Sequence, residues 1–142
     1  MQEQNFKNHA KMVTGYHYVT LPAILIFLIA SINYFINYTA ENKYLGAMFC
    51  LLSVILILIV WYLRGFALKA QDRAIRAEEN FRHYLTSGKP LPQSLRVSQI
   101  IALRFASDEE FVALCAKAAV ENLSNKEIKG LIKNWKGDFY RA

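Results

Sequence analysis

The pattern of hydrophobic and polar positions divides the chain into two long apolar runs and a mixed C-terminal half. The second run, residues 44–63, contains twenty consecutive residues without a charged side chain. A helix of that length spans about 30 Å, which is the thickness of the hydrocarbon layer of a bilayer. A helix in a soluble core is rarely apolar on every side. The run therefore predicts a membrane-spanning helix.

The same helix is expected to continue past the membrane to Leu85, because no stop signal follows the apolar run. Gly65 is a single glycine, which weakens a helix by about 1 kcal/mol without ending it. Residues 64–86 are rich in Lys, Arg, Glu, Ala and Gln, which favour helix. Glu78 and Arg82 are four residues apart, a spacing that favours an ion pair on an exposed helix surface. We expect this extension to stand in water.

An apolar seam continues along the extension with alternating spacings of three and four residues, as in a coiled-coil heptad. Its centre is alanine, so another helix could approach closely. We favour packing against the chain's own C-terminal helices over self-association, because alanine seams drive coiled coils weakly. The seam consists of Ala67, Ala70, Ala74, Ala77 and Phe81, continued by Val60 and Leu63 before it and Tyr84 after it.

The first apolar run, residues 19–36, predicts a second span. It is long for the apolar part of a signal peptide and lacks a clear A-x-A cleavage site, so we expect it to be retained. Pro22 lies in its first turn, where proline is tolerated. Only residues 39–43 separate the two spans, and so short a link requires an antiparallel helical hairpin.

The distribution of basic residues gives the expected orientation. Lys7 and Lys11 precede the first span, Arg64 and Lys69 follow the second, and the link 39–43 carries no net charge. Basic flanks favour the cytoplasmic side of a membrane. We therefore expect both termini in the cytoplasm. The formal net charge of +6 also suits a surface close to anionic lipid.

The spans contain few polar side chains. We expect Asn33 to form a hydrogen bond to Ser53 or to the backbone of the other span, because polar residues in membranes usually bind a neighbouring helix. Ser31 and Asn37 are further candidates. The alternative is a contact with a ligand or another subunit.

Three short helices are expected after the long one. Gly88 can cap the long helix, and the prolines that follow prevent its continuation. Residues 97–105 form the first short helix. The sequences SDEE at Ser107 and SNKE at Ser124 are capping boxes of the form S-x-x-E, and they predict the starts of the second and third.

The last predicted helix is amphipathic and carries lysines on one face. That face has three interpretations: a solvated surface, a contact with anionic lipid, or a contact with phosphates of nucleic acid. Residues 111–135 look like a helix-turn-helix, but the turn lacks glycine and, apart from Asn125 and Asn134, the exposed face lacks side chains suited to reading bases. The lysines are Lys126, Lys129, Lys133 and Lys136.

We find no motif for catalysis or cofactor binding: the sequence has no glycine-rich phosphate loop, H-E-x-x-H, C-x-x-C or G-x-S-x-G. His9, His17 and His83 could lie near one membrane face, but they lack the spacing of metal ligands and are expected to be solvated. Cys50 and Cys115 do not indicate a disulfide. We therefore expect no enzyme, no cofactor and no metal.

Several stretches carry a family resemblance: NFKNHAK, QDRAIRAEE, QIIALRFASDEE and ENLSNKEIKGLIKNW. Over nearly its full length the chain resembles a family of small bacterial proteins with two membrane spans, classified only as a domain of unknown function. The resemblance implies a bacterial origin and an inner-membrane location. It implies no catalytic or binding residue.

Together these observations predict an all-α protein with a transmembrane hairpin and four segments. The segments are a cytoplasmic N-terminus (1–18), the hairpin (19–63), a cytoplasmic extension of its second helix (64–86) and a small domain of three helices (87–142). We expect a non-enzymatic inner-membrane accessory subunit or scaffold. It would bind a protein partner or itself through the groove between its cytoplasmic helices. The alternative is a membrane-tethered binder of nucleic acid or ribosome that uses the four lysines.

Overall fold

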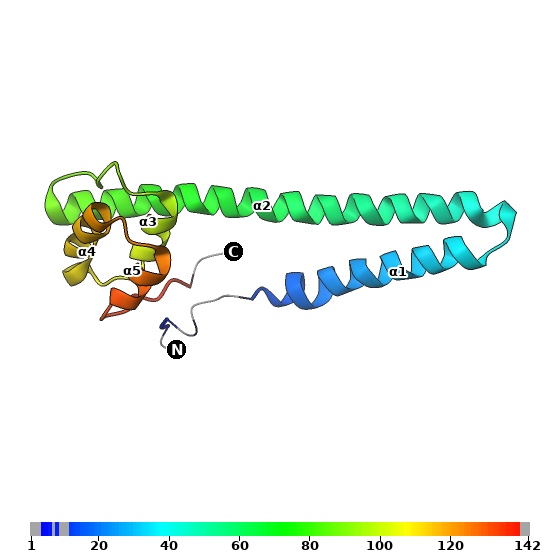
Figure 1. The fold of residues 1–142 in the computed structure, drawn as a ribbon, viewed down its shortest axis with the longest axis horizontal. Helices are drawn as coiled ribbons and strands as arrows, with labels where there is room; N and C mark the ends of the chain where they lie inside the picture. Colours follow the sequence, from blue (N-terminus) through cyan, green and yellow to red (C-terminus); the bar gives the residue numbers. More distant parts are fainter. Residues whose placement is uncertain (1–3, 7, 9–11, 140–142) are drawn as a thin grey trace. The chain divides into compact units, whose positions relative to one another are not determined.

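A computed structural model describes residues 4–6, 8 and 12–139 of the chain. Those residues form helices and no strand, which confirms the predicted all-α class (Figure 1). They divide into two compact units. One comprises residues 12–67, and the other combines the chain from Leu68 onward with the described residues near the N-terminus. We call them the hairpin unit and the helical unit.

The hairpin unit contains two antiparallel helices. A π-helical stretch, Gly15–Thr20, leads directly into α1, Leu21–Asn37. A single 3-10 turn, Ala40–Asn42, connects α1 to α2, Lys43–Ser87. The helical runs Gly15–Asn37 and Lys43–Ser87 are each long and apolar enough to cross a membrane.

The two helices of the hairpin approach closely at a glycine and at a serine pair. A Cβ atom added to Gly46 would lie 2.9 Å from Cα of Phe35, so only glycine fits there without a shift. The hydroxyl oxygens of Ser31 and Ser53 are buried and 3.3 Å apart. Ser53 therefore makes a polar contact between the helices. The predicted hydrogen bond between Asn33 and Ser53 is wrong, because the side chain of Asn33 is exposed.

We expect Gly46→Ala to weaken the association of the two hairpin helices by about 1–3 kcal/mol, because the added methyl group would force the Phe35 backbone to move. The measurement is SDS titration of the purified protein, followed by energy transfer from Trp61 to a dye at Thr14→Cys in a Trp135→Phe background that also carries Cys50→Ala and Cys115→Ala.

Gly65→Ala is the matched control on the same helix. Its new Cβ would meet no atom within 4 Å, and alanine favours helix over glycine by about 1 kcal/mol. Equal titration midpoints for the two variants would show that close packing at position 46 is not needed.

Helix α2 runs unbroken for 45 residues, as predicted for the long helix. It ends where the sequence predicts, because Gly88 adopts a φ of +70° and its N–H donates a hydrogen bond of 2.8 Å to the carbonyl of Tyr84. This left-handed conformation is readily accessible to glycine and reverses the chain direction at the helix end.

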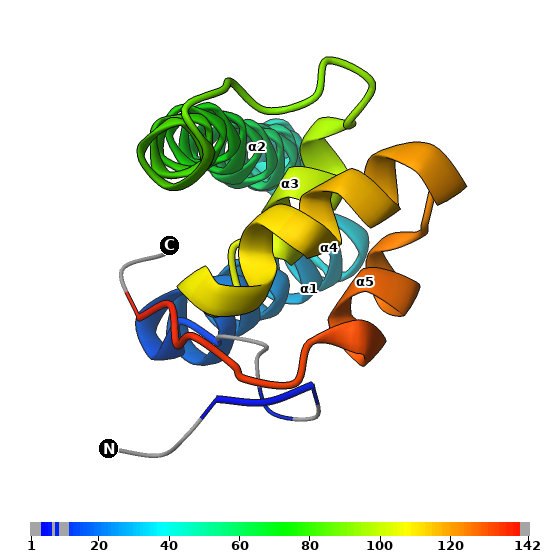
Figure 2. The same ribbon diagram turned by 90° about the vertical axis from the view of Figure 1, so that its left-hand side faces the viewer.

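Three short helices follow, as predicted: α3, Val97–Leu103; α4, Asp108–Glu121; and α5, Asn125–Leu131. They gather beside the C-terminal end of α2 (Figure 2). Their side chains form a buried core that includes Leu103, Phe105, Phe111, Cys115 and Ile128.

Only one face of α2 packs against this core. Ile75, Glu79 and His83 are buried, whereas the alanine seam lies on the exposed side of the helix. Phe81, the largest seam residue, is 62 % exposed. The favoured prediction, that the seam packs against the chain's own C-terminal helices, is therefore wrong. The exposed seam residues are Ala67, Ala70, Ala74, Ala77 and Phe81.

The two predicted capping boxes differ in outcome. Ser124 accepts a hydrogen bond from the N–H of Glu127, and Glu127 accepts one of 2.7 Å from the N–H of Ser124, as predicted. Ser107 begins α4 but makes no side-chain cap. The carboxylate of Glu110, the last residue of the box that begins at Ser107, accepts hydrogen bonds from the backbone N–H groups of residues 133 and 134 instead. It therefore connects α4 to the chain after α5.

Candidate functional site: a polar junction and two grooves

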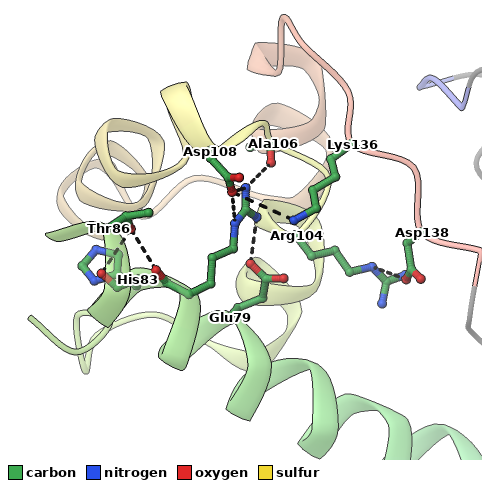
Figure 3. A network of polar contacts seen from close by, with 9 residues as sticks. Glu79, His83, Thr86, Arg104, Ala106, Asp108, Lys136 and Asp138 are labelled. Carbon is green, nitrogen blue, oxygen red and sulfur yellow. Dashed lines mark hydrogen bonds and ion pairs between the residues drawn. The ribbon is translucent and has the colours of Figure 1, made fainter. Parts of the chain in front are cut away.

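A polar junction joins α2 to the start of α4, with the guanidinium of Arg82 at its centre. Its Nε donates to Oδ1 of Asp108 at 2.6 Å, and its Nη1 donates to Oε2 of Glu79 at 3.0 Å. Its Nη2 donates to the carbonyl oxygen of Ala106 at 2.8 Å. Figure 3 shows these three acceptors converging from α2, from α4 and from the link before α4.

Aromatic packing completes the junction. The guanidinium carbon of Arg82 lies 4.1 Å from the ring centroid of Phe111, a distance at which a cation is attracted to the ring face. The predicted pair of Glu78 with Arg82 is replaced by a pair with Glu79, because Glu79 lies on the packed face of α2. Arg82 therefore connects α2 to α4 and does not form an ion pair on an exposed helix surface.

Burial and pairing shift the two carboxyl groups in opposite directions. Burial raises the pKa of Glu79, and the neighbouring Arg82 opposes this only in part. The hydrogen bond and charge of Arg82 lower the pKa of Asp108, whose side chain is 65 % exposed.

The two groups predict opposite pH dependences of stability. Because the folded-state pKa of Glu79 is raised, this residue stabilises the fold most at pH values below its ordinary pKa of 4.5. It loses this contribution as the pH rises through the folded-state pKa. Asp108, whose folded-state pKa is lowered, stabilises the fold at pH values above its ordinary pKa of 3.8. It loses this contribution as the pH falls through the lowered pKa.

We therefore expect the stability of wild type relative to Glu79→Gln to increase as the pH falls from 7 towards 4.5. Relative to Asp108→Asn it should decrease below pH 3.8. The measurement is urea unfolding at several pH values, followed by Trp135 fluorescence in a Trp61→Phe background. Parallel pH profiles for the two variants would contradict the assignment.

His83 forms a second polar contact on the packed face of α2. Its Nδ1–H donates to the carbonyl oxygen of Lys89 at 2.7 Å, and its ring meets Phe111 edge-on. The side chain is buried, so the prediction of a solvated histidine is wrong here. His17 belongs to the hairpin unit, and His9 lies outside the described residues, as do Lys7 and Lys11. No group of three metal-ligating side chains occurs within the part of the chain that the structure describes.

Two grooves flank α2 in the helical unit. The first, about 520 Å³, lies between α2 and the chain after α5, where Lys136 and Asp138 face Arg82 and Arg104. The second, about 480 Å³, lies between α2 and the link to α3. It is lined by Arg73, Arg76, Ala77, Asn80, Pro90, Leu91, Pro92, Gln93, Leu95 and Ile100.

The lysines do not share one helix face, because α5 ends at Leu131. Lys126 and Lys129 lie on α5, and the ammonium of Lys129 is 5.7 Å from the Phe105 ring centroid. Lys133 and Lys136 follow the helix, and Lys136 Nζ lies 4.0 Å from Oδ1 of Asp108. The prediction of a lysine stripe along a single helix is therefore wrong.

Sequence reasoning missed the junction because its partners are distant along the chain. Arg82 and Asp108 are 26 residues apart. The signal that could have located it is the acidic helix start at residues 108–110. The N-terminal segment also joins the helical unit: Gln4 exchanges two hydrogen bonds with the backbone of Asp138, at 3.2 and 2.9 Å.

A comparison with protein families matched residues 1–142 to one model, described as a family of unknown function (DUF6526). Searches of curated proteins and of solved structures gave no match.

Proposed function

The chain belongs to DUF6526, a family of unknown function, along its whole length, and from its own geometry we propose that it is a non-enzymatic anchor and scaffold of the bacterial inner membrane. The hairpin holds it in the bilayer. The helical unit stands in the cytoplasm and binds a protein partner. The observation that carries this proposal is the cluster of exposed aromatic and aliphatic side chains beside the first groove.

Exposed apolar side chains support insertion of the hairpin. A core helix of a soluble protein would bury most of its apolar residues. In the hairpin unit Ile26 is 67 % exposed, and the apolar side chains facing outward continue along both helices from Leu25 to Ile36 and from Leu45 to Leu63. Hydrocarbon is the solvent that suits such a surface.

The contact of Gln4 with Asp138 supports the proposed orientation. Gln4 precedes both spans and Asp138 follows both, yet the two residues form hydrogen bonds within one compact unit. Two membrane crossings return the chain to the side on which it began. The basic residues Arg64 and Lys69 favour the cytoplasm as that side.

Cysteine labelling in intact cells tests this topology. We expect a membrane-impermeant maleimide to label Asn42→Cys, in the link between the spans, and to label Lys89→Cys only after the inner membrane is opened. Both positions are exposed. The background is Cys50→Ala with Cys115 retained, because Cys115 is buried. Labelling of Lys89→Cys from outside, with Asn42→Cys protected, would reverse the orientation.

The proposed contact surface surrounds the first groove. Leu85 is 68 % exposed and Phe139 is 51 % exposed, and both line the groove together with Phe81. Exposed apolar patches with charged borders are typical of protein-binding sites. Arg82, Asp108 and Lys136 supply such a border here.

The test is extraction of the tagged full-length protein from its host in mild detergent, with quantification of the proteins that co-purify. We expect a stoichiometric partner that is retained at high salt and lost in Leu85→Glu and Phe139→Glu. Val120→Glu is the matched control, because Val120 is 86 % exposed on α4 and does not line the groove. Retention of the partner in both groove variants, or absence of a stoichiometric partner, would overturn the proposal.

The same experiment examines the alternative function. Ribosomal proteins or nucleic acid that dissociate as salt rises would indicate phosphate binding by Lys126, Lys129, Lys133 and Lys136. The separation of these lysines between α5 and the following chain weakens that alternative.

A further inference from the structure

The exposed seam of α2 lies on the side opposite the packed face. Successive residues of a helix are rotated by about 100°, which places Ala70, Ala74, Ala77, Phe81 and Tyr84 along one stripe. Ile75, Glu79 and His83, which are buried, fall about half a turn away. The seam is also the ridge between the two grooves, because Glu78 and Phe81 line the first and Arg73 and Ala77 line the second.

Lipid does not account for this apolar ridge. Phe81 lies 18 residues beyond Leu63, the last residue of the apolar run. Phe81 is 62 % exposed and Tyr84 is 55 % exposed. Large aromatic side chains so many residues beyond the apolar run face water unless another protein surface covers them.

We propose that a second copy of this chain covers the seam, through a parallel pairing of the two α2 helices between Ala70 and Tyr84. This inference rests on the proposed membrane anchor. Copies inserted with the same topology present their α2 helices side by side in the same direction. The short helices of each copy lie on the far side of its α2 and leave the seam accessible.

Charge complementarity favours this occupant. In heptad terms Ala74 and Phe81 occupy a positions, Arg73 is the g residue on one border of the seam, and Glu78 is the e residue on the other. Parallel pairing brings each g residue close to the e residue five positions later on the partner helix. Arg73 of one copy therefore meets Glu78 of the other, and the two-fold symmetry creates this pair twice. Antiparallel pairing would place g residues beside g residues and e residues beside e residues, so the pair of Arg73 with Glu78 would not form.

Anchoring in the membrane offsets the weakness of an alanine seam. Alanine contributes little buried area but allows the helix axes to approach, so that Phe81 and Tyr84 can pack against their counterparts. The bilayer confines both copies to a plane and fixes their orientation, which reduces the entropy lost on association.

The first test is charge reversal, with dimerisation of the full-length protein in proteoliposomes measured by energy transfer between labelled copies. We expect Arg73→Glu and Glu78→Arg each to weaken dimerisation by about five- to tenfold, and the double variant to restore it. Arg76→Glu is the matched control, because it makes the same charge change on an exposed position away from the seam. Equal losses for Arg73→Glu and Arg76→Glu, or no rescue, would overturn the pairing.

The second test is oxidative cross-linking in the Cys50→Ala background. Ala74→Cys should form a disulfide-linked dimer in the membrane, because a positions of parallel helices bring Cα atoms within disulfide range. Arg76→Cys should remain monomeric. Cross-linking of Arg76→Cys but not Ala74→Cys would show that a different face meets the second copy.

The two proposals fail in distinguishable ways. If wild type does not dimerise in proteoliposomes but retains a partner that depends on Leu85 and Phe139, the α2 pairing is overturned and the proposed scaffold is left intact. Dimerisation that follows the Arg73 and Glu78 variants, without any groove-dependent partner, would support the pairing and overturn the proposed partner at the groove.

Discussion

Replacement of Phe111 by alanine is expected to destabilise the helical unit by about 3–5 kcal/mol. The Phe111 side chain is fully buried, and its ring lies beneath the Arg82 guanidinium and against the His83 ring. It therefore joins the core of α4 to both polar contacts of α2. Its removal would leave a cavity in this buried core.

Thiol labelling of Cys115 provides the measurement. Cys115 is buried in the same core, and burial raises its pKa to about 12, so reagents should reach its thiolate only when the unit opens. Wild type and Phe111→Ala would be compared in the Cys50→Ala background, in mild detergent and increasing urea. Phe111→Leu, which loses less volume, gives an intermediate value if Phe111→Ala does not fold.

Val120→Ala is the control on the same helix. Val120 is largely exposed, so its truncation should change stability by less than about 0.5 kcal/mol. Similar urea midpoints for Phe111→Ala and Val120→Ala would contradict the role of Phe111 as the central core residue.

Arg82→Met is expected to destabilise the unit by about 3 kcal/mol, although methionine preserves much of the apolar side-chain volume. The substitution leaves the buried Glu79 carboxylate and the Ala106 carbonyl without the hydrogen bonds that Arg82 donates. Asp108 should contribute little to this loss, because water can solvate its exposed carboxylate.

A double-mutant cycle separates the charge from the packing. Glu79→Gln combined with Arg82→Met removes both charges, and we expect it to recover about 1–3 kcal/mol of the loss. The urea midpoint with Cys115 labelling is again the measurement. Arg76→Met is the matched control on an exposed part of α2. Additive effects of the two substitutions would show that Glu79 and Arg82 are not energetically coupled.

Several elements could be predicted from the sequence because their causes are local. The apolar runs specify two long helices, because a helix pairs its backbone N–H and C=O groups within the same segment and needs no polar side chains to do so. Gly88 ends α2 because it can adopt a positive φ, and Ser124 starts α5 through hydrogen bonds to a residue three positions later. In each case the required contacts lie within a few residues of one another.

The end of α5 could not be predicted, because distant groups decide it. The sequence favours helix through Lys136, but Glu110 accepts the backbone N–H groups of Lys133 and Asn134. The N–H of Lys136 donates to the carbonyl of Phe105 at 2.7 Å. These bonds replace the next turn of helix and separate the lysines.

The chain by itself determined its helices, their order and most of their boundaries, because these follow from apolar periodicity, turn residues and short-range hydrogen bonds. Only the tertiary structure decided which face of α2 is buried. Periodicity favours the alanine seam, yet α2 packs through Ile75, Glu79 and His83, because Arg82 finds Asp108 and Phe111 on α4 and stabilises the more polar face. That choice also left the seam exposed.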